Sequence, residues 1–231
     1  MTPDRPTVDA PDPHGGRPFV TAGAPRGAAT AAVVALHGRG ATAQGVVNLL
    51  EPAVPRGVTV LAPSAARSRW YPHDATAPRE RNGPHLASAL AVVDALADRA
   101  VERMGHPRER VVLLGFSQGA CVVAERAVAA PGPHPLVVLS GSLLGPTVDP
   151  DSRVPADADR DDGGPMAGAP AFLASGTDDP HVPAARQAAT AAVLRRLGAD
   201  VTERRYEGVG HEVPDAAFEH VRELLTDLAT R

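Results

Sequence analysis

The sequence predicts a single α/β domain with a mostly parallel central sheet and helices on both faces. Short apolar runs recur along the chain without polar alternation, which is typical of strands buried on both faces of a sheet. Segments with the apolar spacing of amphipathic helices lie between these runs. Because strands and helices alternate, we expect the sheet to be mostly parallel. The length of 231 residues suits one such domain.

The individual elements follow from the positions of these runs. The expected strands are residues 32–36 (AVVAL), 58–61 (VTVL), 111–114 (VVLL), 136–139 (LVVL), 171–174 (AFLA) and 200–206. The expected helices are residues 86–103, 120–129, 184–197 and 216–228. No segment repeats another, so the pattern predicts one domain and not an array of repeats.

Three segments stand outside this alternation. Residues 1–16 are rich in Pro, Asp and Gly, which predicts a disordered tail before a domain at 17–231. Residues 64–84 contain several arginines and a Trp-Tyr-Pro sequence. Residues 141–170 are acidic and long for a loop, and such loops are usually functional or disordered. We expect a long acidic loop there, either a lid or a disordered segment.

Composition excludes several classes of function. The net charge of −4 argues against a nucleic-acid partner, which normally meets a basic face. No apolar stretch has the length of a signal peptide core or a membrane span, so we expect no stable membrane insertion. The single cysteine, Cys121, allows no intramolecular disulfide and suits a reducing compartment. We therefore expect a cytoplasmic protein, either a monomer or a homodimer.

The strongest motif is residues 115–119 (GFSQG), which follow an expected strand and precede an expected helix. This G-x-S-x-G pattern is typical of a tight strand-to-helix turn that lifts a serine hydroxyl above the edge of the sheet. The flanking glycines leave room across the turn, and the helix directs its N-terminal N–H groups toward the serine. We expect Ser117 to be a nucleophile.

A serine nucleophile needs a histidine base and a carboxylate that orients it. In chains with this turn, the acid and the histidine follow the serine in that order. Asp178 and Asp179 both lie in the turn after an expected strand, and either could be the acid or cap the next helix. His211 lies in a glycine-rich loop after the last expected strand. We expect His211 to be the general base.

The reaction also needs two N–H donors that bind the negative oxygen of the transition state. One is the backbone N–H of Gln118, the residue after the serine. The second is expected from the loop at 37–40 (HGRG), where we choose the backbone N–H of Arg39. His37 in the same loop is expected to be structural.

Together these segments resemble the phospholipase/carboxylesterase family of α/β-hydrolases, which includes the acyl-protein thioesterases. The resemblance rests on residues 36–40 (LHGRG), 115–120 (GFSQGA), 179–183 (DPHVP) and 208–211 (GVGH), and it extends over residues 17–231. In this family the acid directly precedes proline in the third segment, which favours Asp179 over Asp178. Residues 70–72 (WYP) are similar to a segment of small bacterial carboxylesterases. Trp70 and Tyr71 are therefore candidates for substrate binding, with ordinary packing as the alternative.

The resemblance implies hydrolysis of short- to medium-chain carboxylic esters or thioesters, with a small molecule as the substrate and no cofactor. The same three catalytic residues would serve a lactone, a dienelactone or a lysophospholipid, because specificity lies in the loops. A catalytically silent binding protein is a further alternative. Residues 157–161 (DADRD) begin like a calcium loop, but Asp162 and Gly168 occupy the positions of its required Gly and Glu, so no metal is expected.

Overall fold

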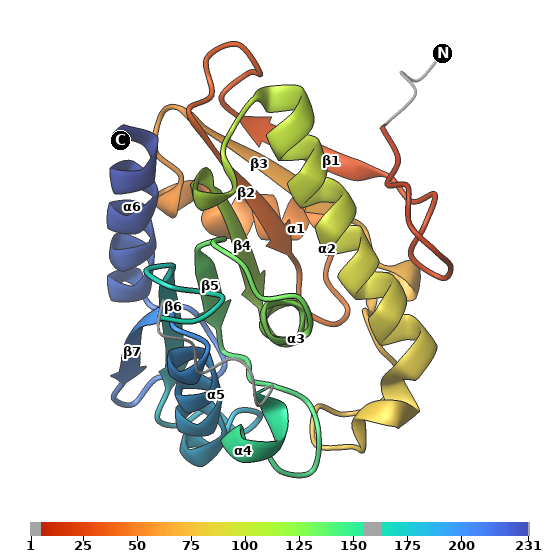
Figure 1. Cartoon of the computed structure of the whole chain (residues 1–231), viewed down its shortest axis with the longest axis vertical. Coiled ribbons are helices and arrows are strands. Elements are labelled where there is room, and N and C mark those ends of the chain that lie inside the picture. Colours follow the sequence, from red (N-terminus) through yellow and green to blue (C-terminus); the bar gives the residue numbers. More distant parts are fainter. Residues whose placement is uncertain (1–5, 155–162, 231) are drawn as a thin grey trace.

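The computed structural model describes residues 6–154 and 163–230, which form one layer of β-sheet between two layers of helices (Figure 1). In these ranges the sheet has seven strands in the order β1-β3-β2-β4-β5-β6-β7. They are β1 Phe19–Gly23, β2 Ala31–Leu36, β3 Val58–Pro63, β4 Val111–Phe116, β5 Leu136–Leu139, β6 Pro170–Gly176 and β7 Asp200–Tyr206. All neighbours pair in parallel except β1, which is antiparallel to β3. The predicted single α/β domain with a mostly parallel sheet is confirmed.

Within the described residues, six helices connect and flank the strands. They are α1 Ala43–Leu50, α2 Gly83–Met104, α3 Gln118–Ala129, α4 Pro150–Arg153, α5 Ala184–Arg196 and α6 Asp215–Thr230. Short 3-10 turns lie at Glu51–Ala53, Ala66–Ser68, Arg79–Asn82 and Arg108–Arg110. Buried side chains of α2, α3 and α5 pack on one face of the sheet, and those of α1 and α6 pack on the other. The four helices expected from the sequence are present.

The strands divide their side chains between these two cores. In β2, for example, Ala32, Val34 and Leu36 face the core beneath α2 and α3, whereas Ala31 and Val33 face α1 and α6. A central parallel strand therefore needs apolar residues at every position, which explains the uninterrupted runs in the sequence. β7 departs from this expectation. It is an edge strand whose residues are all exposed or partly exposed, and charged side chains suit that position.

The strand order places a crevice at one edge of the sheet. The chain runs from β2 outward to β3 and then returns to β4 on the other side of β2. Connections from the carboxyl ends of β2 and β4 therefore leave in opposite directions. Open α/β sheets bind ligands at such a point, where the strand order reverses. Residues 37–40 and 117–119, which carry the predicted nucleophile and oxyanion donors, lie at this point.

Residues 6–16 correct one expectation from composition. Val8 and His14 are buried at 3% and 0% exposure. The His14 backbone N–H donates to Ser88 Oγ at 3.0 Å, and the imidazole Nδ1 accepts from the Ala66 N–H at 3.0 Å. The prediction of a disordered tail is therefore wrong for residues 6–16, because two well-placed side chains anchor a segment whose overall composition is polar. Residues 1–5 lie outside the described residues.

The expected acidic loop at 141–170 is described only in part, because residues 155–162 lie outside the described residues. Its first part runs buried along the carboxyl edge of the sheet, from Gly141 to Gly145, and then forms α4. The Gly145 N–H donates to the Ala75 carbonyl at 2.8 Å, which joins this segment to the irregular residues before α2. The two irregular segments thus meet beside the sheet edge. Whether the acidic loop acts as a lid stays a prediction.

Candidate active site

Ser117 occupies a strained turn between β4 and α3. Its φ of 54° and ψ of −118° lie outside the regions that non-glycine residues usually adopt. The turn is also extremely tight, since a Cβ on Gly115 would lie 2.3 Å from the Gly119 carbonyl carbon. A Cβ on Gly119 would lie 2.3 Å from the Leu36 carbonyl oxygen in β2. Both glycines are therefore required sterically, and the strain raises the Ser117 hydroxyl above the sheet edge.

Three predicted residues form one continuous chain of hydrogen bonds. The Ser117 Oγ lies 2.8 Å from His211 Nε2, and His211 Nδ1 lies 2.8 Å from Asp179 Oδ2. The three residues come from the ends of β4, β6 and β7, which are up to 94 positions apart in the chain. Both imidazole nitrogens are engaged, so Nδ1 carries the proton toward the carboxylate and Nε2 faces the hydroxyl as an acceptor. This arrangement allows His211 to take the serine proton.

The structure separates the two adjacent aspartates. The Asp179 side chain is fully buried, and its Oδ1 accepts from the backbone N–H groups of His181 at 2.8 Å and Val182 at 3.2 Å. Its other oxygen, Oδ2, is left for His211. Asp178 is exposed, and its carboxylate accepts only from the neighbouring Thr177 hydroxyl among the described residues. Of the two candidates from the sequence, Asp179 is the one that contacts His211.

Two aromatic rings pack against His211. The Phe116 ring centroid lies 5.3 Å from that of His211, and the His181 ring contacts it edge-on at 4.7 Å. His181 lies in the DPHVP segment and was not among the residues predicted for the site. Its position two residues after the acid was the available signal, because the turn around Asp179 carries the His181 side chain back toward His211. These contacts limit the orientations that the imidazole can adopt.

A cavity of about 560 Å³ opens beside the Ser117 hydroxyl. Its lining comes from the turn after β4, both irregular segments and the loops that carry Asp179 and His211. The lining residues are Arg39, Tyr71, Asp74, Ala75, Thr76, Ser117, Gln118, Cys121, Ser140, Ser142, Pro180, His181, Val182, Pro183 and His211. The cavity walls are therefore mostly small or polar, with no large aliphatic side chain among the described residues that line them.

The two aromatic candidates for substrate binding have different positions. Tyr71 lines the cavity, and burial together with the nearby Cys121 thiol raises the pKa of its phenol well above the usual value. Trp70 is fully buried and does not line the cavity. Its ring packs between His14 and His37, and its indole N–H donates to the His37 carbonyl at 2.8 Å. The expectation that Trp70 contacts substrate is therefore wrong, because the ring serves the packing of the loop beneath the site.

The two predicted oxyanion donors lie in segments that adjoin Ser117. Arg39 and Gln118 both line the cavity, and neither backbone N–H has an acceptor among the described residues. A Cβ on Gly38 would lie 3.3 Å from Ser117 Cβ, so the loop after β2 passes very close to the serine. Free N–H groups beside a nucleophile are the arrangement that stabilises an oxyanion.

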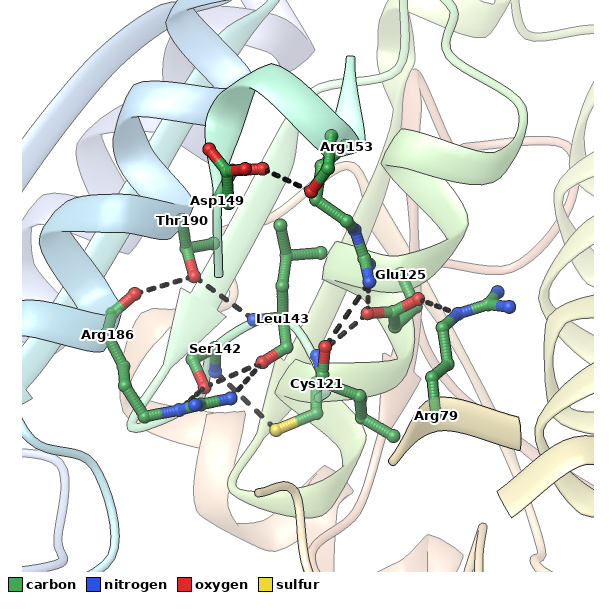
Figure 2. A network of polar contacts seen from close by, with 11 residues as sticks. Arg79, Cys121, Glu125, Ser142, Leu143, Asp149, Arg153, Arg186 and Thr190 are labelled. Carbon is green, nitrogen blue, oxygen red and sulfur yellow. Dashed lines mark hydrogen bonds and ion pairs between the residues drawn. The ribbon is translucent and has the colours of Figure 1, made fainter. Parts of the chain in front are cut away.

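A buried carboxylate on α3 ties together the segments around the cavity (Figure 2). The Glu125 side chain is 1% exposed and accepts from Arg79 Nε at 2.7 Å, from the Leu144 N–H at 2.8 Å and from Arg153. Arg79 lies in the irregular segment before α2, and Arg153 lies in α4. One side chain on the helix that follows Ser117 thus anchors both irregular segments.

Three further observations concern metal binding, membrane-spanning helices and the cysteine. Among the described residues, no group of three His, Cys, Asp or Glu side chains is arranged to bind a metal ion. None of the helices in the described ranges is both long and apolar enough to cross a membrane. Cys121, the single cysteine, is a buried thiol whose pKa is raised by burial.

The fold and the arrangement of Ser117, His211 and Asp179 define an α/β-hydrolase. The chain belongs to the phospholipase/carboxylesterase family, whose sequence model matches residues 18–228. Members of this family are carboxylic ester hydrolases, so the predicted family and enzyme class are confirmed.

Individual relatives agree with this assignment. Acyl-protein thioesterase 1 from Gibberella zeae is 31% identical over 118 residues, which make up 51% of this chain and 47% of that protein. The chain thus matches about half the length of this curated relative. A phospholipase/carboxylesterase from Dyadobacter fermentans has a TM-score of 0.82 and 30% identity over 94% of this chain and 99% of its own. A carboxylesterase from Mesorhizobium loti has a TM-score of 0.69 at 22% identity, covering 91% and 94% of the two chains, which supports the fold alone.

Proposed function

We propose that this chain hydrolyses short- to medium-chain carboxylic esters or thioesters through an acyl-enzyme on Ser117. The observation that carries the proposal is the unbroken chain of 2.8 Å hydrogen bonds from the Ser117 hydroxyl through His211 to Asp179. The family is one of ester hydrolases, and one relative is named as an acyl-protein thioesterase. Both facts suit an acyl transfer to serine.

The proposed reaction has two steps. In the first, His211 Nε2 takes the Ser117 proton while Oγ attacks the substrate carbonyl, and the backbone N–H groups of Arg39 and Gln118 hold the oxyanion. The leaving alcohol or thiol receives the proton from His211, which leaves an ester on Ser117. In the second, His211 removes a proton from water, the resulting hydroxide attacks the acyl carbon, and the acid departs as Ser117 regains its proton. Asp179 remains ionised and holds the imidazole in one tautomer.

The cavity supports a preference for the shorter acyl groups in this range. Each methylene that enters an apolar environment gains about 0.8 kcal/mol, and this gain drives the binding of long chains. Here the wall beside Ser117 is made of polar or small residues, including Tyr71, Ser140 and Ser142. A long alkyl chain would meet no large aliphatic side chain among these lining residues and would gain less than in an aliphatic pocket.

The test is turnover of p-nitrophenyl esters from acetate to palmitate by wild type and by Ser117→Ala. We expect wild type to turn over the acetate and butyrate esters fastest, and Ser117→Ala to lose about 10⁶-fold in kcat because the nucleophile is absent. A fluorophosphonate probe should label wild type and leave Ser117→Ala unlabelled. Failure of wild type both to turn over every ester and to react with the probe would overturn the proposal.

A further inference from the structure

We infer that the side chains of Arg39 and Gln118 are positioning residues, which set the geometry of the oxyanion hole by clamping one shared segment, residues 70–73. This inference rests on the proposed function and extends it. The backbone N–H groups of these two residues are the proposed oxyanion donors. Their side chains take no part in the proposed oxyanion binding. Both side chains instead form hydrogen bonds to the backbone of residues 70–73.

Gln118 holds the segment from the side of α3. Its side-chain oxygen accepts from the Trp70 N–H at 2.8 Å, and its side-chain nitrogen donates to the Tyr71 carbonyl at 2.8 Å. The residue is 5% exposed, so these bonds are shielded from water. A glutamine amide can satisfy a backbone donor and a backbone acceptor at once, which aspartate or glutamate cannot do. The residue beside the nucleophile is therefore fixed to residues 70–71.

Arg39 holds the same segment from the side of β2. Its guanidinium donates to the carbonyls of Tyr71 at 3.3 Å, Pro72 at 3.1 Å and His73 at 2.9 Å. The Tyr71 carbonyl therefore accepts from both clamping side chains. The planar, multi-donor guanidinium suits three carbonyls in a row, whereas the compact ammonium of lysine does not.

Two further hydrogen bonds, one from the Trp70 side chain and one to Ser68 just before the segment, reinforce the link to the loop after β2. The Gly40 N–H donates to the Ser68 carbonyl at 2.7 Å, and the Trp70 indole donates to the His37 carbonyl at 2.8 Å. The loop that carries the Arg39 N–H and the turn that carries the Gln118 N–H are therefore connected through one bridge. The pairing of β2 with β4 brings the two donors together, and the position of the bridge then sets their spacing more finely. Preorganised donors lose effect when their spacing changes.

The test compares Arg39→Met and Arg39→Lys with wild type, because both replacements keep the backbone N–H. We expect each to lower kcat by about 10- to 100-fold, less than the 10²–10³-fold loss of an oxyanion donor itself, with KM within about threefold. Affinity for a boronic acid, which forms a tetrahedral adduct on Ser117, should fall in parallel with kcat. Arg67→Met is the matched control, since this exposed arginine in a neighbouring turn has no side-chain partner among the described residues and should retain wild-type kcat.

A second variant tests whether the two side chains act through one segment. Gln118→Glu keeps the acceptor for the Trp70 N–H but loses the donor to the Tyr71 carbonyl. We expect the Arg39→Met/Gln118→Glu double variant to lose less than the product of the single losses, since either change releases the same segment. Thermal unfolding of each variant checks that the fold persists.

The outcomes separate the inference from the proposed function. Wild-type kcat in Arg39→Met, or full rescue by Arg39→Lys, would overturn the clamp while leaving the ester hydrolase intact. If the loss in kcat of the double variant equals the product of the two single losses, the two side chains act separately. That result would also contradict the clamp. Absence of turnover in wild type would overturn the proposed function and the clamp together.

Discussion

Two adjacent aspartates leave β6, and the surrounding backbone decides which of them can orient His211. Asp179 has its Oδ1 occupied by two N–H groups from the turn that follows, which fixes Oδ2 toward the imidazole. Asp178 points outward and contacts Thr177. The residues alone could not distinguish them, because both occupy the same strand exit. The proline after Asp179, through the family resemblance, was the deciding signal.

We predict that Asp179→Asn lowers kcat by about 10⁴-fold, because an amide in place of the carboxylate favours the wrong imidazole tautomer. Asp178→Asn is the matched control on the neighbouring residue. As an exposed substitution it should change the activation free energy by no more than about 0.5 kcal/mol, or about twofold in kcat. The measurement is kcat on p-nitrophenyl butyrate, with circular dichroism to verify folding. Equal losses in the two variants would contradict the assignment of Asp179.

Other single residues differ in whether their roles could be predicted from the sequence. The serine and histidine were predictable because each is a polar residue in a strand-exit loop with glycine neighbours. Trp70 was a candidate for substrate binding because residues 70–72 are similar to a segment of small bacterial carboxylesterases, with ordinary packing as the alternative. The structure favours packing, because the Trp70 ring is buried between two histidines. The role of the Arg39 side chain was invisible because its partners are backbone carbonyls more than 30 positions away, which carry no sequence signal.

At the scale of elements, α3 does more than present the nucleophile. Its Glu125 holds Arg79 and Arg153, so the helix anchors the two irregular segments that line the cavity (Figure 2). The carboxylate is buried in the middle of the helix, where a charge is unfavourable unless it is fully paired. Two arginines and one backbone N–H supply that pairing.

We predict that Glu125→Ala lowers the free energy of unfolding by about 1–3 kcal/mol, since it leaves the buried Leu144 N–H without an acceptor and removes the partner of Arg79 and Arg153, whose side chains are 41% and 17% exposed. Asp98→Ala is the matched control. Asp98 pairs with Arg108 in an ion pair whose side chains are both 46% exposed, and its loss should cost less than about 1 kcal/mol. Urea unfolding followed by circular dichroism measures both values. Comparable costs for the two variants would show that the Glu125 network adds no stability beyond that of a surface ion pair.

The elements that the sequence revealed are those with the strongest apolar signal. The central strands were found because burial on both faces demands apolar residues at every position. β1 was missed because only Phe19 is buried while the rest of the strand is partly or fully exposed, and α1 was missed because it is only eight residues long. β7 was predicted as a strand buried on both faces, but it is a partly exposed strand at the edge of the sheet. Its place at the sheet edge depends on the order of all seven strands, which no local pattern encodes.

At the scale of the whole molecule, the N-terminal residues 6–16 pack against the rest of the domain through His14, which contacts Ser88, Ala66 and Trp70. Their composition resembles a flexible tail, but His14 accepts from the Ala66 N–H and lies 2.9 Å from the Trp70 carbonyl through its other nitrogen. His37 accepts from the Ala65 N–H through Nε2. Two neutral imidazoles from distant parts of the chain thus support the same loop. A segment average of composition cannot detect contacts made by one or two residues.

These histidines lead to a prediction for the stability of the whole domain against acid. Burial lowers the pKa of His14, His37, His106 and His134 below the ordinary value of 6.5. In the unfolded chain these four imidazoles take up protons as the pH falls through 6.5, whereas in the native state they do so only at lower pH. Native stability is therefore retained above this pH and lost below it, by up to about 1.4 kcal/mol per pH unit for each histidine.

Urea unfolding between pH 7.5 and 5.5 tests this prediction in a range where unshifted carboxylates stay largely ionised. The free energy of unfolding should fall steadily over the lower half of the range. His14→Gln removes one of the four groups, so its stability should depend less steeply on pH than that of wild type, even if the variant is less stable at pH 7.5. A free energy independent of pH down to 5.5, or an unchanged slope in His14→Gln, would show that burial does not keep these imidazoles neutral.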